Sequence, residues 1–276
     1  MGADNSEPEV SDSLKTFGAV LKALRDEGGL TQEQFAPRVR YSVTYVAKME
    51  QGRRFPPKEL IPRTEEVLGA LAARVLGAAY RTLMRKAGLA SWFSPWADIE
   101  EEAVSLYTYE CRAIPGLLQP ESYIRTAFEQ RLPPLSEAQI ELQVTARLER
   151  QRLLTERPNT AFSFVIEQAL LDRGFGGVEV TKALLDNLLV QQARRNVEIQ
   201  VMPLHRETHA GIDGLMYLAE TPQHEWLGYS EGQQSSVLIT NPKDVSAMLQ
   251  RYGKLRSQAL GHEATLNLLE QMRGVQ

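Results

Sequence analysis

Cysteine, histidine and long apolar runs are scarce in this sequence. It has one cysteine, Cys111, and four histidines among 276 residues. A single cysteine cannot form an internal disulfide, so the cysteine content gives no reason to place the chain in an oxidising compartment. No run approaches the roughly 18 uninterrupted apolar residues that a membrane-spanning helix needs. These absences predict a cytoplasmic protein.

Motifs that would indicate an enzyme or a cofactor are also absent from the sequence. It has no glycine-rich phosphate loop, no nucleophile elbow and no pairing of cysteine with histidine of the catalytic type. His205 and His209 flank Glu207, but this spacing is not that of a zinc-binding helix, and Pro203 and Gly211 favour a loop. We therefore expect no enzymatic activity, no cofactor and no metal.

Charge is distributed unevenly along a chain whose net charge is −4. Residues 1–13 carry four acids and no bases, and residues 14–90 carry 14 lysines and arginines against 7 acids, a net charge of +7. Residues 91–276 carry 17 bases against 24 acids, a net charge of −7. This asymmetry is typical of a protein in which one module faces a polyanion and another does not, although a solvated basic face would give the same count.

The spacing of apolar residues predicts two domains of different class. Over 14–88 the apolar residues recur at helical intervals, which predicts an all-α domain of five short helices. Over 101–276 helical stretches alternate with β-branched and aromatic runs, which predicts a mixed α/β domain. Residues 1–13 are expected to form a disordered acidic tail, and 89–100 a linker whose aromatic residues pack on one of the domains.

The expected elements can be placed to within a few residues. In the first domain the expected helices cover 16–27, 31–37, 42–50, 58–69 and 71–87. In the second domain the expected strands cover 103–110, 161–168, 196–203, 214–220, 225–231 and 235–240. The expected helices of that domain cover 120–130, 136–155, 177–195 and 242–258.

The stretch "LTQEQFAPRVRYSVTYVAKMEQGRR", residues 30–54, carries the signals of two capped helices joined by a tight turn. Thr31 can cap the first helix, and Gln34 three residues later can complete a capping box. Ser42 can cap the second helix, in which Val46 and Met49 share one face. The stretch therefore predicts a helix-turn-helix.

These residues resemble the XRE, or Cro/C1-type, helix-turn-helix regulators. The family pattern is met by Leu30-Thr31-Gln32, Phe35-Ala36, Ser42 and Met49-Glu50-Gln51-Gly52. The resemblance implies a transcriptional regulator whose 42–50 helix enters the major groove of double-stranded DNA. The candidate DNA-binding residues are Gln32, Ser42, Val43, Thr44, Tyr45, Ala47, Lys48, Arg53 and Arg54.

Four of these candidates occupy positions that face outward in the family. Thr44 can hydrogen-bond a base or a phosphate, and Lys48 can reach a guanine edge or a phosphate. Val43 and Ala47 can pack on a thymine methyl group. Because these side chains are small, we expect DNA shape to contribute much of the sequence preference.

The other candidates are expected at the DNA backbone. Gln32 and Ser42 lie at helix N-termini, where free N–H groups hold a phosphate, and Tyr45 can reach the same backbone. Arg53 and Arg54 follow the helix directly and can run along the phosphates or enter the minor groove.

Four further residues shape the motif itself. Glu50 is expected to tether the motif internally, and Gly52 to allow the left-handed turn that ends its second helix. Two residues depart from the family pattern. Pro37 removes a backbone donor, so we expect the first helix to end early, and Arg40 replaces the usual glycine of the turn, which requires a different or strained turn.

The second half of the chain resembles the Scr1-type C-terminal domain of actinobacterial XRE regulators. The resemblance is carried by "IPGLLQPESYIRTAF" (114–128), "RLERQRLL" (147–154), "FVIEQALL" (164–171) and "VEIQVMPLHRETHAGIDG" (197–214). It implies a regulatory domain with antitoxin-like pairing to small partner proteins. Arg147 and Arg150 share a helix face and could hold an anionic effector or a partner carboxylate, with Glu167 a further candidate; surface salt bridges are the alternative.

Together these features predict a nucleoid-associated homodimer that binds a pseudo-palindromic DNA operator and senses a ligand or a protein partner through its C-terminal domain. The alternative is an antitoxin-like protein whose main role is to bind a small partner protein, with DNA binding autoregulatory.

Overall fold

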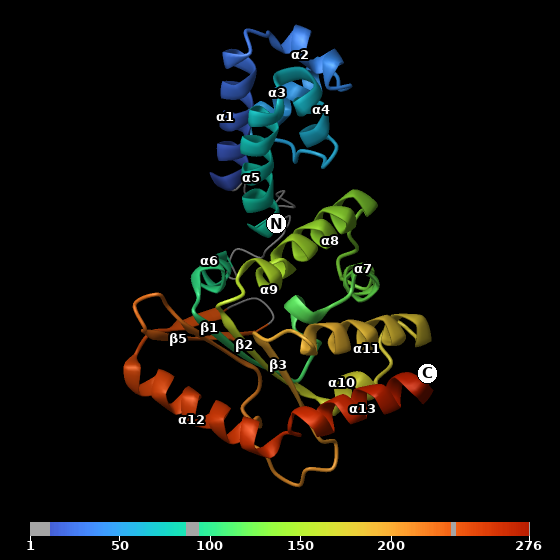
Figure 1. Cartoon of the computed structure of the whole chain (residues 1–276), viewed down its shortest axis with the longest axis vertical. Helices are drawn as coiled ribbons and strands as arrows, with labels where there is room; N and C mark the ends of the chain where they lie inside the picture. Colours follow the sequence, from blue (N-terminus) through green and yellow to red (C-terminus); the bar gives the residue numbers. More distant parts are fainter. Residues whose placement is uncertain (1–11, 87–93, 233–235, 276) are drawn as a thin grey trace, which may run out of the picture. The chain divides into compact units, whose positions relative to one another are not determined.

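The computed structural model of the chain describes residues 12–86, 94–232 and 236–275 (Figure 1). The chain divides into two compact units, Met1–Gly88 and Leu89–Gln276. The tail expected over 1–13 lies outside the described residues except at Asp12 and Ser13, which begin the first helix. No helix in the described part of the chain combines the length and the apolar character needed to cross a membrane.

The N-terminal unit is all-α over its described residues, as predicted. Its helices are α1 (Asp12–Glu27), α2 (Gln32–Arg38), α3 (Val43–Glu50), α4 (Leu60–Leu68) and α5 (Ala70–Lys86). Each begins and ends within four residues of its expected bounds. Their core is formed by side chains that are at most 5% exposed, among them Phe17, Leu21, Phe35, Val46, Met49, Leu60, Leu76, Tyr80 and Leu83.

The predicted caps of α2 and α3 are present. The Thr31 hydroxyl accepts the Gln34 N–H at 3.3 Å, and the Gln34 side chain accepts the Thr31 N–H at 2.9 Å. The Ser42 hydroxyl accepts the Tyr45 N–H at 3.2 Å. Both helices therefore start where the sequence placed their caps.

The turn between α2 and α3 corrects one expectation and confirms another. Helix α2 continues through Pro37 and ends at Arg38, so the expected early end is wrong. The proline leaves only the carbonyl of exposed Glu33 without its helical donor, and solvent can reach that position. Arg40 has φ 64°, so an arginine adopts the strained left-handed conformation that glycine favours. The Tyr41 N–H closes the turn on the Ala36 carbonyl at 2.9 Å.

The C-terminal unit is built on a six-stranded mixed sheet, as predicted. Its strands are β1 (Ser105–Glu110), β2 (Ala161–Glu167), β3 (Val197–Met202), β4 (Met216–Glu220), β5 (Trp226–Glu231) and β6 (Ser236–Ile239), in the order β3-β2-β1-β4-β5-β6. Strand β1 pairs in parallel with β2 and β2 with β3, whereas β4, β5 and β6 continue the sheet antiparallel. The direction of pairing thus changes between β1 and β4.

The helices of this unit include three that the sequence did not predict. Those expected are α7 (Glu121–Glu129), α8 (Glu137–Gln151) with α9 (Leu153–Glu156), α11 (Val178–Gln192) and α12 (Pro242–Gln258). Those missed are α6 (Ser94–Glu102), α10 (Gln168–Asp172) and α13 (His262–Val275), besides a short 3₁₀ helix, Gly116–Leu118. The linker expected over 89–100 is therefore wrong from Ser94 onward, because a proline fits the first turn of a helix. Trp96 of α6 is 1% exposed and stacks on Tyr229, so this aromatic residue packs on the C-terminal unit.

Helices cover both faces of the sheet (Figure 1). Helix α12 runs along one face, where Tyr252 and Met248 join Tyr109, Val165 and other residues in one apolar cluster. Helices α6, α9 and α11 lie on the other face, where a larger cluster gathers Trp96, Leu106, Leu153, Ile166 and Leu184. Alternate residues of each strand thus point to two separate cores.

Candidate nucleic-acid interface

The outer face of helix α3 carries most of the predicted DNA-binding residues. Ser42, Val43, Thr44 and Lys48 are exposed, with Val43 36% exposed, whereas Ala47 is half-buried. The inner face of the same helix is fully buried at Val46 and Met49. A helix that has one buried face and one exposed face of short side chains can enter a DNA groove without disturbing its own core.

The inner face of α3 is anchored through the carboxylate of Glu50. Arg25 of α1 donates from Nε to Oε1 at 2.6 Å and from Nη2 to Oε2 at 3.0 Å. Gln32 of α2 donates to Oε2 at 2.6 Å, and Arg25 also donates to the Leu30 carbonyl at 2.7 Å. The hydrogen bond to Glu50 raises the pKa of Arg25. The three helices are therefore joined by one buried ion pair whose geometry is bidentate, which confirms the internal role predicted for Glu50.

Gln32 has a structural contact that the sequence did not suggest. Its side-chain amide is half-buried and donates to Glu50, although we placed this residue at a phosphate. The amide nitrogen has a second N–H, so contact with a phosphate remains a prediction. A glutamine at the start of a helix gives no local sign of a partner 18 residues away.

The chain leaving α3 is fixed by its backbone. Gly52 has φ 65°, and a Cβ atom there would lie 2.8 Å from Cα of Lys15. The Arg53 N–H bonds the Lys48 carbonyl at 2.8 Å, which closes the helix end. Arg53 and Arg54 are exposed directly beyond this turn. The predicted role of Gly52 is confirmed.

Two stacked tyrosines support cations beside α3. The rings of Tyr41 and Tyr45 stack with centroids 5.2 Å apart. The Arg54 guanidinium lies 4.7 Å from the Tyr45 ring centroid, and that of Arg63 lies 4.9 Å from the Tyr41 ring centroid. These contacts hold both guanidinium groups by cation–π attraction. Arg63, on α4, was not predicted, because only the fold brings it to Tyr41.

The surface around α3 is strongly basic. Between positions 38 and 58 the sequence holds six lysines and arginines and one acid, Glu50. Because Glu50 is buried and paired with Arg25, it adds little negative potential at the surface. The pair between exposed Arg40 and Glu66, at 3.5 Å, is too solvated to cancel much charge. This stretch therefore presents positive potential to a polyanion.

The predicted effector residues of the C-terminal unit do not form one site. The Arg150 Nε atom lies 3.0 Å from Glu100 of α6 in a buried ion pair. Glu167 accepts the Tyr109 hydroxyl at 2.7 Å and thus belongs to the α12 face of the sheet, opposite the α6 face to which Arg150 connects. Arg147 forms no ion pair within the described residues and donates to Gln119 at 2.8 Å. The two arginines are thus brought together, but Glu167 is not.

The histidines expected to bind no metal, His205 and His209, lie in a loop of turns between β3 and β4. His205 is exposed, and the Nδ1 atom of His209 accepts the Gly211 N–H at 3.1 Å. Among the residues that the structure describes, no three side chains of histidine, cysteine, aspartate or glutamate gather as metal ligands would.

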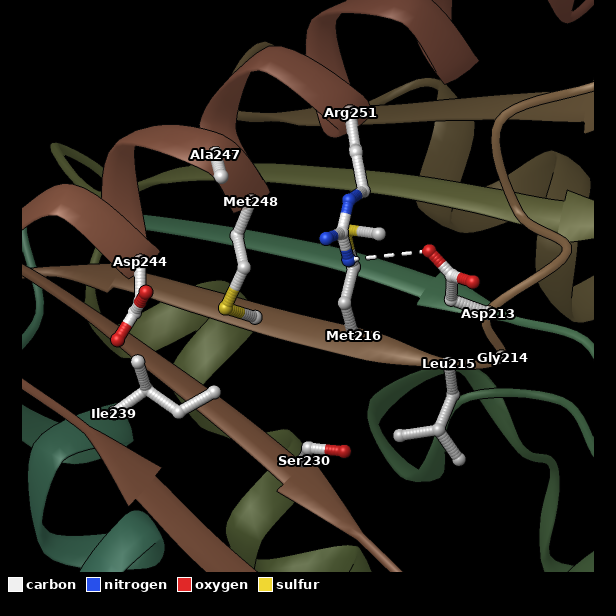
Figure 2. A pocket seen from close by; sticks show the side chains of 10 residues that line it. All are labelled: Asp213, Gly214, Leu215, Met216, Ser230, Ile239, Asp244, Ala247, Met248 and Arg251. Atoms are coloured by element: carbon white, nitrogen blue, oxygen red, sulfur yellow. Dashed lines mark ion pairs between the residues drawn. The ribbon is translucent and has the colours of Figure 1, made fainter.

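A hollow of about 210 Å³ lies between α12 and the end of the sheet that carries β6. Figure 2 shows the side chains that line it. Arg251 and Asp213 pair across it at 3.3 Å, and both are about half exposed or more. Met216, Met248 and Ile239 line its apolar part. Its volume is below that of sites for drug-sized ligands, and its ion pair is satisfied internally, so this hollow does not suggest a ligand site.

Comparison with known proteins assigns both halves of the chain. Residues 16–79 match the family model of a helix-turn-helix domain, so this part is a helix-turn-helix DNA-binding domain. Residues 93–271 match the model of a domain of unknown function (DUF5753). No curated protein and no solved structure matches the chain.

Proposed function

Because the chain belongs to the DUF5753 family and carries a helix-turn-helix DNA-binding domain, we propose that it is a sequence-specific transcriptional regulator. The observation that carries this proposal is the division of α3 into a buried face, anchored at Glu50, and an exposed face beside Arg53 and Arg54. The resemblance of residues 30–54 supports an XRE, or Cro/C1-type, regulator. The resemblance of the second half supports a C-terminal unit of the Scr1 type.

In the proposed complex α3 lies in the major groove of double-stranded DNA. Thr44 and Lys48 contact base edges, and Val43 and Ala47 pack on thymine methyl groups. Ser42, Tyr45 and Gln32 contact phosphates, which fix the register of the helix but carry no base preference. Arg53 and Arg54 add the long-range attraction that depends on salt.

The proposed regulator acts as a homodimer. One α3 helix spans only a few base pairs, and a second copy related by a two-fold axis supplies the missing affinity and specificity. The operator is then pseudo-palindromic, with half-sites about 34 Å apart. We assign the C-terminal unit the role of sensing a ligand or a protein partner, and place the protein in the cytoplasm with the nucleoid.

The test is selection of bound DNA from a random pool by the full chain, followed by affinity measurements across salt concentrations. Replacing Arg53 and Arg54 by Ala removes two phosphate contacts from each subunit, four in the homodimer, and lowers the slope of log affinity against log salt by about 3.6. The matched control is Lys22→Ala with Arg74→Ala, which removes two exposed charges from α1 and α5. We expect this control to lose much less affinity.

The same experiment tests base reading. Thr44→Ala and Lys48→Ala change which sequences are recovered, whereas the double arginine variant weakens binding to all sequences alike. Full affinity of the arginine variant at physiological salt would refute the proposed interface. A small protein that co-purifies in equal amount, with DNA binding serving only autoregulation, would instead favour an antitoxin-like role.

A further inference from the structure

Arg147 of α8 is a cation without a carboxylate partner in the described part of the chain. Its guanidinium donates to the Gln119 amide oxygen at 2.8 Å and lies 4.7 Å from the Phe128 ring centroid. Burial, together with repulsion by Arg150 and Arg131, lowers its pKa. Neither a neutral amide nor an aromatic ring supplies the negative charge that a poorly hydrated guanidinium favours.

Glu110, the last residue of β1, has an unused polar atom. It is 5% exposed, and its Oε1 atom accepts the hydroxyl of Tyr217. Its other oxygen, Oε2, is buried and has no hydrogen-bond partner among the described residues. Burial raises the pKa of Glu110, which favours the neutral acid. A neutral carboxyl group can donate a hydrogen bond as well as accept one.

Trp96 of α6 has a second unused polar atom. The residue is 1% exposed, yet its indole Nε1–H has no acceptor within the described residues. Its ring lies 5.1 Å from that of Tyr229 and 6.0 Å from that of Tyr217, centroid to centroid. Buried polar groups in native proteins almost always have partners, so two such orphans connected through one tyrosine require an explanation.

These groups belong to one region of the fold. Tyr217 contacts the Trp96 ring and donates to Glu110. Arg150, one turn after Arg147 on α8, pairs at 3.0 Å with Glu100, one turn after Trp96 on α6, so the two helices lie side by side here. The region lies at the carboxyl end of β1, where β1 has a parallel neighbour on one side and the antiparallel β4 on the other. Ligands of open α/β sheets bind in crevices outside the carboxyl ends of strands.

We propose that Trp96, Glu110, Arg147 and Tyr217 form a binding site for a small organic carboxylate that has an aromatic body. The inference rests on the sensing role proposed above for the C-terminal unit. The carboxylate pairs with Arg147 and supplies the missing charge. The aromatic body packs against Trp96, Tyr217 and Tyr229, and polar atoms of the ligand satisfy Trp96 Nε1–H and Glu110 Oε2. A water molecule could satisfy either orphan, but it would not supply a charge to Arg147.

The test follows the indole N–H resonance of Trp96 by nuclear magnetic resonance in the full chain. The protein has three tryptophans, and Trp96→Phe identifies the resonance. The probes are phenylacetate and indole-3-acetate, each compared with its uncharged amide at neutral pH and constant ionic strength. Both carboxylates shift the Trp96 resonance saturably at millimolar concentrations. The amides bind at least about tenfold more weakly, because they lack the charge-assisted hydrogen bond to Arg147.

Variants of α8 locate the carboxylate. Arg147→Met keeps the apolar contact with Phe128 and removes the preference for carboxylate over amide. Arg147→Lys keeps the charge but not the planar fork, so it binds more weakly while retaining the preference. The control, Arg152→Gln, changes an exposed arginine of the same region and leaves binding unchanged. If Arg147→Met does not fold, the comparison of Arg147→Lys with the control decides.

Three results would overturn the proposal. They are no saturable shift of the Trp96 resonance with either carboxylate, equal binding of acid and amide by the wild type, and variants that behave like it, with an unchanged preference in Arg147→Met or an unchanged affinity in Arg147→Lys. The titration needs no DNA, so its outcome is separate from that of the DNA-binding test. A Trp96 shift in a chain that binds no DNA leaves the site intact and refutes the regulator, and the reverse result refutes the site alone.

Discussion

Each unit of the chain holds a buried arginine–glutamate pair, Arg25–Glu50 and Arg150–Glu100, but the C-terminal unit also holds an arginine and a glutamate that form no ion pair among the described residues. In the N-terminal unit Arg25 holds both oxygens of Glu50, and Gln32 adds a further hydrogen bond. In the C-terminal unit Arg147 contacts an amide and a ring, and Glu110 has one oxygen without a partner in the described residues.

This difference distinguishes residues that hold the fold together from residues that belong to a candidate binding site. A buried charge whose partners are all present holds elements in place, and removal of one partner leaves an uncompensated charge. A buried polar group without a partner lowers stability, so its presence calls for an explanation, such as a ligand that binds it. The Arg25–Glu50 pair is therefore part of the scaffold that presents α3, whereas Arg147 and Glu110 are part of a candidate site.

The largest effect is expected when the scaffold pair is broken. Arg25→Met leaves Glu50 buried without its cation and lowers the free energy of unfolding of the N-terminal unit by about 3–5 kcal/mol. Native-state hydrogen exchange of the α3 amides measures this change. Replacing both Arg25 and Glu50 by Met restores part of the loss, because no charge is then left buried. Arg74→Met, at an exposed position of α5, is the control and stays near the wild-type value. If Arg25→Met behaves like Arg74→Met, the pair is not a scaffold.

A smaller effect, with the opposite sign at neutral pH, is expected at Glu110. The pKa of Glu110 is raised above its usual 4.5, so the folded chain binds more protons than the unfolded chain between the two values. Its contribution to stability is present below that range and is lost as the pH rises through the raised pKa. Glu110→Gln lacks this loss, so the variant gains stability relative to the wild type as the pH rises.

Tryptophan fluorescence during denaturant unfolding at several pH values measures this difference in the C-terminal unit, because residues 1–88 contain no tryptophan, whereas Trp96 and Trp226 lie in that unit. The charged groups that face Glu110 are Arg112 and Glu231, which pair with each other at 2.8 Å. A difference that does not change with pH would show that the Glu110 carboxyl titrates alike in the folded and unfolded chain.

The smallest effect is expected at the surface ion pairs of Arg152. This arginine is 47% exposed and pairs with Glu149 at 3.2 Å and with Glu156 at 2.7 Å. Arg152→Ala lowers the free energy of unfolding by less than about 1 kcal/mol, because exposed pairs are screened by water and salt. The same fluorescence measurement checks this value in low and high salt. A loss as large as that of Arg25→Met would remove the distinction between buried and exposed pairs.

Local signals in the sequence were sufficient for most of the fold. The helical spacing of apolar residues, with the caps at Thr31 and Ser42, placed the described helices of the N-terminal unit, and the β-branched and aromatic runs placed the described strands of the sheet. Helix α6 was missed because serine and proline were interpreted as a linker, although proline also suits the first turn of a helix. Helix α13 was missed although Leu268, Leu269 and Met272 have helical spacing, a signal that was present in the sequence.

The candidate site residues likewise include some that local signals predict and others that only the fold reveals. The outward face of α3 follows from helix periodicity and from the family resemblance. Contacts between residues far apart in the chain cannot be predicted from periodicity or from the resemblance. The contact of Glu50 with Arg25 spans 25 positions, and that of Tyr217 with Glu110 spans 107. Glu167 was placed with the arginines because all three are charged, but a strand turns successive side chains to opposite faces. Only the three-dimensional structure shows to which face of the sheet the Glu167 side chain points.

The division of α3 into a buried face and an exposed face also affects how the sequence of such a protein can change during evolution. Val46, Met49 and Glu50 hold the helix, whereas Val43, Thr44 and Lys48 take no part in that core. Random changes at the outer positions therefore cost little stability, since surface substitutions are usually within about 0.5 kcal/mol. In the DNA-binding regulator proposed above, a copy made by gene duplication can therefore change its DNA preference by substitutions at these few positions, each intermediate remaining folded.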